Sequence, residues 1–485
     1  MRQQVDINST LIRQLGGLPQ QTAAEGRVRS PLTINFNLLE AAGRKVDFTG
    51  VVEYAVQQSP DTAFLSGRLN QVPEGLFNII IHRGLLGLRV FSPDGNFALH
   101  PDLNGEYVVE QEGPGAPFLC KVLPPRRHRR EGRPRPGFTR EANGSLVDVL
   151  IVYTTSAKEY YNNNVPNLER AVREMEAFGN LALRRSLPDV DPPLQLRFVA
   201  IEEVPDTVGS SLEDYAFNSS GKPIRDKRDA HKADLVVVIR RSMTWAGQAF
   251  PMCDLESPNY YSRRAYAHVR ADYVEQIKTI PHEIAHLFGG QHNPGSVDSC
   301  SLYSDSRGHA FAAPDGQGVL RQYGTILSYE NYLNRIPGFS NPSVLYQGVP
   351  TGKAGTRNNA RAIRDSRLQL SDYRISSNPL PGQPPVVSIL SPQSGAQMPG
   401  NTEITISVRI TDNESVASAG LYWQHTNSYM NCPGSGGEWT CSQTGDVYNW
   451  KISVSSGTRI YQVVATDNRG EVTLSPFQTI TLTGQ

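Results

Sequence analysis

The sequence predicts a multidomain protein: a β-rich N-terminal domain, a central α/β domain with a mainly parallel sheet, and a C-terminal antiparallel β-sandwich. Three observations support this prediction. The chain of 485 residues is too long for one ordinary core and favours roughly two to four domains. Short alternating apolar segments occupy both ends, whereas buried strands alternate with helical patterns in the middle. Two proline-rich segments separate these three parts.

Composition excludes some classes of protein. The 47 basic and 47 acidic residues cancel to a formal net charge of zero, which argues against a main role in binding nucleic acid or an anionic membrane. No apolar run is long enough to span a bilayer, so we expect no transmembrane segment. The first residues, MRQQVDINST, lack the hydrophobic segment of a signal peptide. If the protein is secreted, we expect that its signal has been removed; we also expect a monomer.

The predicted N-terminal domain covers 1–122, with short alternating strands from about 46 to 112. The basic, proline-rich segment that follows, 123–145, can neither pack nor continue a sheet, so it is predicted to be a linker. Clustered arginines such as RRHRR are commonly a solvated or nucleic-acid-touching tail. The alternative is a processing site, because a trypsin-like protease can enter an exposed basic segment between two folded units.

The central α/β domain is predicted over 146–376. It begins with the buried strand LVDVLIVYT, and the strand-like segments LQLRFVAIEEV and ADLVVVIRR follow further along. Between the first two strands lies a helix whose apolar positions keep a spacing of three to four residues: Leu168, Val172, Met175, Phe178 and Leu181. Strands that alternate with helices indicate a mainly parallel sheet covered by helices.

A second proline-rich linker is predicted at 377–385, and beyond it short strands recur at regular spacing over 386–485. This pattern favours an antiparallel sandwich. The segments VRITDNESVASAGLYW and YQVVATDNRGEV resemble the Ig-like repeats found at the ends of secreted bacterial enzymes. The resemblance says little about what this domain binds.

Four of the five cysteines form two plausible pairs. Cys432 and Cys441 bracket a glycine-rich turn between strand-like segments, which favours a local disulfide. Cys253 and Cys300 lie on either side of a histidine cluster and could link that domain. Cys120 is left over. Paired cysteines favour an oxidising, periplasmic or extracellular compartment; the alternative is five buried thiols in a cytosolic protein.

The histidine cluster lies in PHEIAHLFGGQH. On a helix, His282 and His286 project from one face and can reach a single ion, and Glu283 lies beside them as a candidate general base. The glycine pair that begins at Gly289 ends the helix and lets His292 return as a third ligand. Three protein ligands leave the open position that a catalytic zinc requires, whereas a structural zinc takes four.

Two histidines and a glutamate at this spacing can arise by chance on an ordinary helix, but the added glycine and third histidine make coincidence a poor explanation. The remaining histidines show no such spacing and are predicted to be ordinary polar or packing residues: His82, His100, His128, His231, His268, His309 and His425.

The segment HEIAHLFGGQH is similar to the extended zinc signature of the metzincins. Upstream, WAGQAFPMC resembles the edge strand of reprolysin-like members, which implies that Gly247, Gln248, Ala249 and Phe250 bind an extended peptide. Downstream, YGTILSYENYLNRIPGFSNP resembles the Met-turn region of secreted bacterial zinc peptidases. The likeness covers about 146–376 and points to reprolysin-like and peptidyl-Asp-type bacterial enzymes.

The chain departs from the family at the Met-turn, where Leu327 replaces the methionine beneath the metal. Leucine has nearly the same volume, so we expect an altered rather than an abolished site. Tyr329 matches a tyrosine that ligates zinc or stabilises the oxyanion in some relatives; the alternative is a packing tyrosine. By analogy, Arg335 would favour acidic side chains in the substrate.

The resemblance implies a secreted zinc-dependent endopeptidase that acts on proteins or peptides, with one catalytic zinc held by His282, His286 and His292 and with Glu283 as general base. A calcium site is compatible with the chain, but nothing in the sequence indicates one. The rival class is a binding protein: a degenerate peptidase scaffold, disabled at Leu327, that displays the C-terminal sandwich as an adhesive module.

Cys120 stands in FLCKV, just before the basic linker, which resembles the position of the cysteine switch in metzincin propeptides. A thiolate is a strong zinc ligand and would keep the precursor inert by displacing the catalytic water. An activating protease that cuts within Arg126 to Arg130 would release it. The alternative is an unpaired structural thiol.

Overall fold

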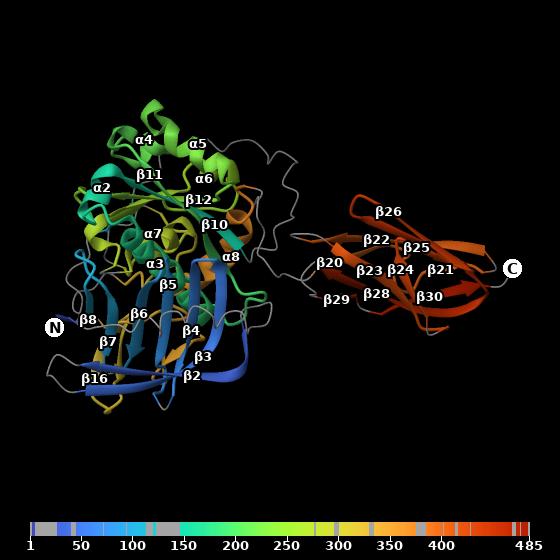
Figure 1. Ribbon diagram of the computed structural model, residues 1–485, viewed down its shortest axis with the longest axis horizontal. Coiled ribbons are helices and arrows are strands. Elements are labelled where there is room, and N and C mark those ends of the chain that lie inside the picture. Colours follow the sequence, from blue (N-terminus) through green and yellow to red (C-terminus); the bar gives the residue numbers. More distant parts are fainter. Residues whose placement is uncertain are drawn as a thin grey trace. The chain divides into compact units, whose positions relative to one another are not determined.

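The computed structural model describes the chain except for 1, 5–26, 40–44, 71, 94, 113–119, 123–145, 276–277, 295–299, 329–333, 375–384, 401, 413–415, 427, 468–471, 476 and 484–485. The chain divides into two compact units: 1–22 together with 26–377, and 23–25 together with 378–485. The predicted basic linker lies outside the described residues, as does nearly all of the proline-rich one. Figure 1 shows the elements of each unit.

The N-terminal part of the first unit is one antiparallel sheet in the order β1-β8-β7-β6-β5-β4-β3-β2. It has its own apolar core, which includes the fully buried Phe77 and Val90. The β-rich prediction for this part is therefore confirmed. The strands are β1 (Arg2–Gln4), β2 (Arg27–Leu39), β3 (Lys45–Ser59), β4 (Thr62–Leu69), β5 (Leu76–His82), β6 (Leu85–Ser92), β7 (Gly95–Pro101) and β8 (Tyr107–Glu112).

The central sheet has the order β11-β10-β12-β14-β13-β9. Its first four strands are parallel, and β13 runs antiparallel to β14. Helices cover both faces of such a sheet, which explains why the middle strands are continuous apolar runs. The predicted α/β class is confirmed. The strands are β9 (Cys120–Val122), β10 (Leu146–Thr154), β11 (Gln195–Val204), β12 (Leu235–Arg240), β13 (Gly247–Ala249) and β14 (Tyr266–Arg270).

The longest helix, α3 (Val165–Ser186), buries its predicted apolar stripe in the core of the central domain. Its N-cap is Asn164, whose side chain accepts a hydrogen bond from the Asn167 amide. The other helices are α2 (Thr155–Tyr160), α4 (Leu212–Phe217), α5 (Lys222–Ala230), α6 (Pro258–Ser262), α7 (Thr279–Leu287) and α8 (Asn359–Leu370), with 3₁₀ turns η2 (Asp206–Val208), η3 (Ser219–Gly221) and η4 (Ala271–Tyr273). Short strands complete this unit: β15 (Ala310–Pro314), β16 (Leu320–Gly324), β17 (Asn334–Arg335), β18 (Leu345–Tyr346) and β19 (Val349–Pro350).

The second unit is a sandwich of two sheets, β20-β22-β27-β26-β25 and β21-β30-β28-β23-β24 with β29 beside β28. Trp423, Trp450 and Tyr461 fill the space between the sheets, so the predicted sandwich is confirmed. The strands are β20 (Val386–Ser391), β21 (Gln397–Pro399), β22 (Thr402–Thr411), β23 (Val416–Trp423), β24 (Ser428–Cys432), β25 (Gly434–Gly436), β26 (Trp439–Thr444), β27 (Val447–Val454), β28 (Gly457–Asp467), β29 (Val472–Leu474) and β30 (Gln478–Thr483).

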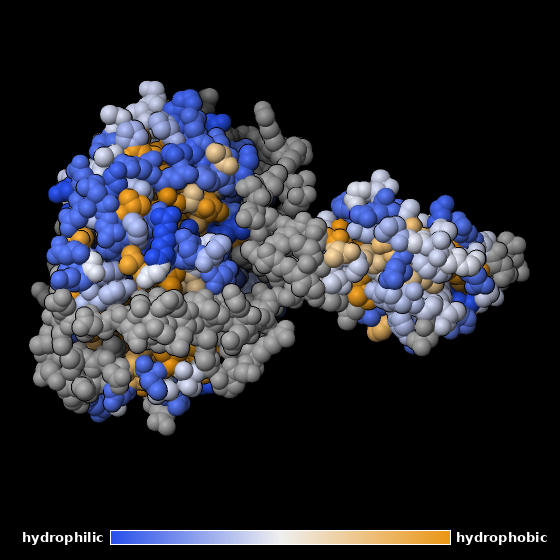
Figure 2. Space-filling model, in the orientation of Figure 1, coloured by the Kyte–Doolittle hydropathy of each residue, from blue (hydrophilic) through white to orange (hydrophobic). Residues whose placement is uncertain are grey.

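The described helices include none with the length and apolar character needed to cross a membrane. On the face drawn in Figure 2, hydrophilic residues dominate the surface over α4 and α5.

Candidate metal centre

The centre is built on α7 and the turn that ends it. His282 and His286 are one helical turn apart and are both almost completely buried. Gly289 ends the helix with a φ of +86°, and a Cβ at this position would lie 2.8 Å from the Cβ of Leu302. A residue with a side chain would be strained and crowded here, so glycine is what allows the chain to reverse. The reversal returns His292 to the two rings on the helix.

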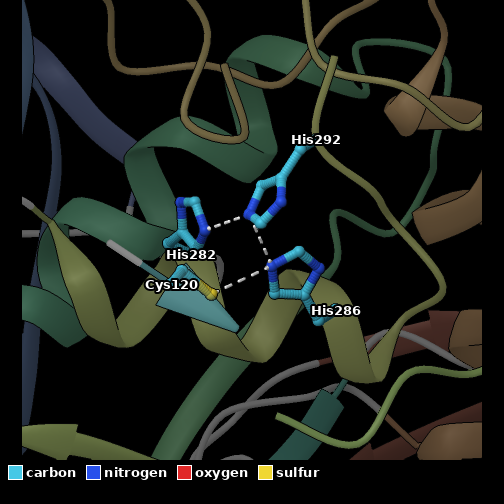
Figure 3. A group of neighbouring side chains, drawn as sticks. All are labelled: Cys120, His282, His286 and His292. Atoms are coloured by element: carbon cyan, nitrogen blue, oxygen red, sulfur yellow. Dashed lines mark hydrogen bonds between the residues drawn. The ribbon is translucent and has the colours of Figure 1, made fainter. Parts of the chain in front are cut away.

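The three imidazoles converge through their Nε2 atoms (Figure 3). The Nε2 of His292 lies 3.0 Å from the Nε2 of His282 and 3.2 Å from that of His286. The Nδ1 of His282 lies 2.9 Å from the carbonyl of Ile326, and the Nδ1 of His286 lies 2.8 Å from that of Gly290. A carbonyl can only accept a hydrogen bond, so each Nδ1 carries the proton and each Nε2 presents a lone pair.

This arrangement fits a zinc ion. Ligand atoms about 2.0–2.3 Å from one tetrahedral zinc lie roughly 3.3–3.6 Å apart, close to the separations observed here. Burial lowers the pKa of His282 and of His286 well below the usual range, with the neighbouring histidines contributing. Neutral rings are the form that binds a metal, and lone pairs that face one another need a cation between them.

The fourth member of the cluster is Cys120, on β9. Its Sγ lies 3.7 Å from the Nε2 of His286, and the four ligand atoms all lie within 4.8 Å of one another. Figure 3 shows the thiol directed toward the same point as the three rings. Thiolate and imidazole are both donor groups that zinc binds, and four protein ligands would close its coordination.

Glu283 lies on α7 beside the cluster and is completely buried. Neither of its carboxylate oxygens has a nitrogen or oxygen hydrogen-bond partner among the described residues. Burial raises the pKa of this carboxyl well above its usual value, and the nearby Cys120 thiol lowers it by less. A buried carboxyl without a donor is costly, so its position fits a site where a ligand or water supplies the missing partner.

Because Gly247 has no side chain, it leaves space for the carboxyl group of Glu283. A Cβ on this residue would lie 2.1 Å from Oε1 of Glu283 and 2.6 Å from its Cδ. We therefore expect Gly247→Ala to displace the carboxyl and to lower kcat/KM of the activated protein by roughly 10²-fold, since misplacement by about 1 Å can have that effect. Peptide hydrolysis, zinc content and circular dichroism would be measured together. Loss of zinc or of the fold would show that the change acts by another route.

A matched control is Gly338→Ala in the same unit. There a Cβ would meet Ser186 Oγ at 3.4 Å, an ordinary contact, and the backbone needs no left-handed conformation. We expect this variant to keep full activity. Equal losses in both variants would contradict the specific role of Gly247.

The predicted substrate strand is already paired. Gly247, Gln248 and Ala249 form β13, which pairs with β14 on one side. On its other side β13 pairs in parallel with β9, so that Gly247 lies opposite Cys120 and Ala249 opposite Val122. Phe250 follows the strand, and its amide donates to the carbonyl of Tyr266. The edge expected to receive a peptide therefore holds the end of the N-terminal part of this chain.

The structure places the remaining predicted residues as follows. Leu327 is completely buried, and a Cβ at Gly290 would lie 2.7 Å from its Cδ1, so leucine fills the space under the turn. Tyr329 lies outside the described residues. Disulfides join Cys253 to Cys300 and Cys432 to Cys441, the same pairs that the spacing favours.

The other described histidines lie apart from the centre. Within the described part of the chain, the only cluster of potential metal ligands is the one around His282. His268 hydrogen-bonds to Gln248 at 3.0 Å, and burial lowers its pKa to about 3. His231 lies 2.7 Å from Glu202. His82 and His100 lie near Glu169 and Glu275 in the N-terminal interface, and His128 lies outside the described residues.

Some contributors were not found from the sequence. The carbonyls of Ile326 and Gly290 orient two rings, but a backbone atom leaves no signal in residue type. Arg335, suggested from the sequence only by analogy as a substrate contact, donates to the carbonyls of Thr325 and Ser328, and its charge contributes to the low pKa of His282. Its anchoring depends on contacts between segments, which no spacing rule predicts.

The fold and the site together define a class. A helix with two histidines, a third beyond a glycine turn, a buried glutamate and an adjacent edge strand, all on a mainly parallel sheet, are features of a reprolysin-like metallopeptidase domain. Residues 143–323 match a family model described as metallo-peptidase family M12, and 385–465 match one described as bacterial Ig domain. The chain therefore carries a metallopeptidase domain of family M12 and a C-terminal bacterial Ig domain.

Curated relatives agree with this assignment. A peptidyl-Asp metalloendopeptidase of Xanthomonas campestris is 24% identical over 289 residues, which cover 57% of this chain and 65% of that one. A peptidyl-Asp metalloendopeptidase of Stenotrophomonas maltophilia is 25% identical over 246 residues, covering 49% and 55%. The chain thus spans less than two thirds of the length of these relatives. A solved chaperone–substrate complex is similar at 14% identity and a TM-score of 0.36, covering 59% of this chain and 39% of that one.

Proposed function

We propose that this chain is a secreted zinc-dependent endopeptidase made as a latent precursor. One observation carries the proposal: the Nε2 atoms of His282, His286 and His292 converge beside the buried carboxyl of Glu283, which has no nitrogen or oxygen partner among the described residues. The two disulfides favour an oxidising compartment and so support secretion.

His282, His286 and His292 would hold the ion. When bound, zinc lowers the pKa of a water molecule toward about 7 and polarises the scissile carbonyl. Glu283 accepts the proton of the attacking water and then delivers it to the leaving amine. The edge of β13 positions the substrate by backbone hydrogen bonds, which fix the scissile bond against the carboxyl. A contribution of Tyr329 to the oxyanion stays a prediction.

The substrates are proteins or peptides, and an acidic residue beside the scissile bond is the preference we propose. The relatives are named for action at peptidyl-Asp bonds. Arg335 supplies a positive charge close enough to lower the pKa of His282, and its guanidinium is held by the carbonyls of Thr325 and Ser328. A guanidinium that is fixed in place near the scissile bond can bind a carboxylate side chain of the substrate.

Latency follows from β9. Its pairing with β13 occupies the substrate edge, and its Cys120 contributes a fourth donor where the attacking water must enter. The alternative, a structural thiol, does not require Sγ to lie among three Nε2 atoms. An activating protease that cuts within Arg126 to Arg130 would separate β9 from the peptidase domain.

The test is metal content together with activity. Protein cut in the linker and freed of its N-terminal part should contain about one zinc per chain and cleave casein, and a chelator should abolish cleavage until zinc is restored. The rival function, an adhesive scaffold, predicts a zinc-free protein without hydrolytic activity. Cleavage of a peptide library then identifies which side chains the enzyme prefers next to the scissile bond.

A further inference from the structure

The N-terminal sheet is bound to the central domain through the charged side of α3. Its strands β5 and β6 pack on this helix, which also packs on β11 of the central sheet (Figure 1). An amphipathic helix normally turns its charged side to water. In this precursor that side is covered instead, and its charged residues find their partners on the N-terminal sheet.

The centre of this interface is a group of buried ions. Arg89 of β6 pairs with Glu174 of α3, and the two side chains are 1% and 0% exposed. Arg89 also pairs with Glu112 of β8 and donates to the backbone carbonyl of Glu275 at 2.8 Å. On the helix, Glu174 pairs with Arg170. Charges from both domains thus neutralise one another where the side chains are almost completely buried.

Further polar contacts follow the helix outward in both directions. Toward its start, Glu169 meets Arg83 at 2.8 Å and His82 at 3.2 Å. Toward its end, Arg185 meets Glu74 at 2.6 Å. In addition, Gln58 donates to Glu176 at 2.6 Å and Arg184 donates to Ser66 at 2.8 Å. Charged and polar contacts therefore run along the whole length of α3.

The same interface reaches the metal helix. Lys278, at the start of α7, lies 3.6 Å from Glu112 and is 3% exposed. Its ammonium lies over the rings of Phe91 and Phe178, at 4.9 and 5.2 Å from their centroids. Phe91 of the N-terminal sheet belongs to the core of the central domain, and Leu76 of β5 and Leu103 pack against that core. Apart from these residues, the apolar cores of the two parts are separate among the described residues.

A cut in the linker leaves all these contacts in place. Cys120 follows Glu112 after only seven residues, 113–119, which span at most about 25 Å. While the N-terminal sheet stays bound, the thiol is held near the metal at an effective concentration on the order of millimolar. Cleavage alone therefore leaves the inhibitory segment beside the site.

We infer that the charged side of α3 is a docking surface for the N-terminal domain of this chain, and that this domain remains bound after the linker is cut. Its release is a second, salt-sensitive step, and in the unaltered chain, where Cys120 is present, only that step opens the metal centre. The outer pairs, Arg83 with Glu169 and Arg185 with Glu74, are partly exposed, so salt screens them and slows the re-association of the two domains. The inference rests on the proposed latency for its consequence, but the docking itself does not depend on peptidase activity.

The test uses the full chain as Glu283→Gln, which cannot digest itself if the proposed function holds, cut briefly with trypsin in the basic linker. Gel filtration should show both fragments together at about 0.05 M sodium chloride and apart at about 1 M, where the Debye length is about 3 Å. Separate elution at low salt would overturn the inference. Joint elution at both concentrations would also overturn it, because release would not be salt-sensitive.

A substitution at Arg89 tests whether the buried ions make the contact between the two fragments. Arg89→Met keeps much of the volume and removes the central charge, so the cut fragments should associate at least about tenfold more weakly. The matched control is Arg68→Met on the same sheet. The Arg68 side chain is 67% exposed and pairs only at the surface with Glu53. In this variant the cut fragments should associate as strongly as those of the unaltered chain. Equal binding by the Arg89 and Arg68 variants would contradict docking through the buried ions.

A parallel measurement separates this inference from the proposed function. In cut protein that retains Glu283, casein cleavage should appear only in fractions from which the N-terminal fragment has been removed. If the fragments separate in a salt-dependent way but no fraction cleaves casein, the docking inference is supported and the proposed peptidase function is contradicted. Full cleavage while the fragments remain together would reject release as the opening step.

Discussion

Replacing Glu283 with glutamine should leave zinc bound and lower kcat for peptide hydrolysis by roughly 10²–10⁴-fold, the usual contribution of a general base. The amide has nearly the shape of the carboxyl but cannot accept the proton of the attacking water. The three imidazoles are oriented by the carbonyls of Ile326 and Gly290 and do not depend on Glu283. Zinc analysis and casein hydrolysis by the activated protein would be measured on one preparation.

The matched control for this variant is Glu256→Gln. Glu256 is an exposed residue of the same unit, so its replacement should leave both zinc content and hydrolysis unchanged. Undiminished hydrolysis in Glu283→Gln would remove Glu283 from the role of general base. Loss of zinc from that variant would show that the carboxyl is needed to build the site rather than to move a proton.

Replacing Cys120 with alanine should give activity to the uncut precursor. The change removes the sulfur donor from among the three Nε2 atoms and leaves β9 attached to β13 by a strand of only three residues. Such a short strand is a weak competitor for a peptide substrate once the bond to the metal is gone. We expect casein cleavage by intact Cys120→Ala chain at least about tenfold above that of the unaltered precursor, since a coordinating thiolate blocks the open position.

Two controls belong to this experiment. The double variant Cys120→Ala/Glu283→Gln should stay inert, which excludes a contaminating protease, and gel electrophoresis should show that the linker is still intact during the assay. A Cys120→Ala precursor that stays fully latent would contradict the thiol switch. Latency would then come from the docked N-terminal sheet and β9 alone.

Sequence reasoning was most successful where the signal is local. The apolar spacing from Leu168 to Leu181 predicts one side of α3, and that side is buried in the central core. The spacing of His282 and His286 predicts one face of α7, and the glycine that begins the turn predicts its end. In each case, residues a few positions apart determine the local backbone, so the pattern carries the geometry.

It was less successful where two distant segments meet. Cys120 and His286 are 166 positions apart, and only the resemblance to a propeptide suggested that they could come together. The pairing of β9 with β13 and the room that Gly247 leaves for Glu283 had no counterpart in spacing or residue type. Charges on α3 gave no sign that a second domain covers them, because they look like an ordinary solvated side.

By itself, then, the sequence determined the three-part architecture, the metal helix with its turn and the cysteine pairs. Hydrophobic periodicity and ligand spacing describe residues within one element or in neighbouring elements. They therefore predict local geometry whatever the packing of the rest of the chain. Only the tertiary structure decided that Cys120 lies with His282, His286 and His292 and that β9 fills the substrate edge. Those contacts depend on how separate sheets and helices pack, and packing is a property of the assembled chain rather than of any segment.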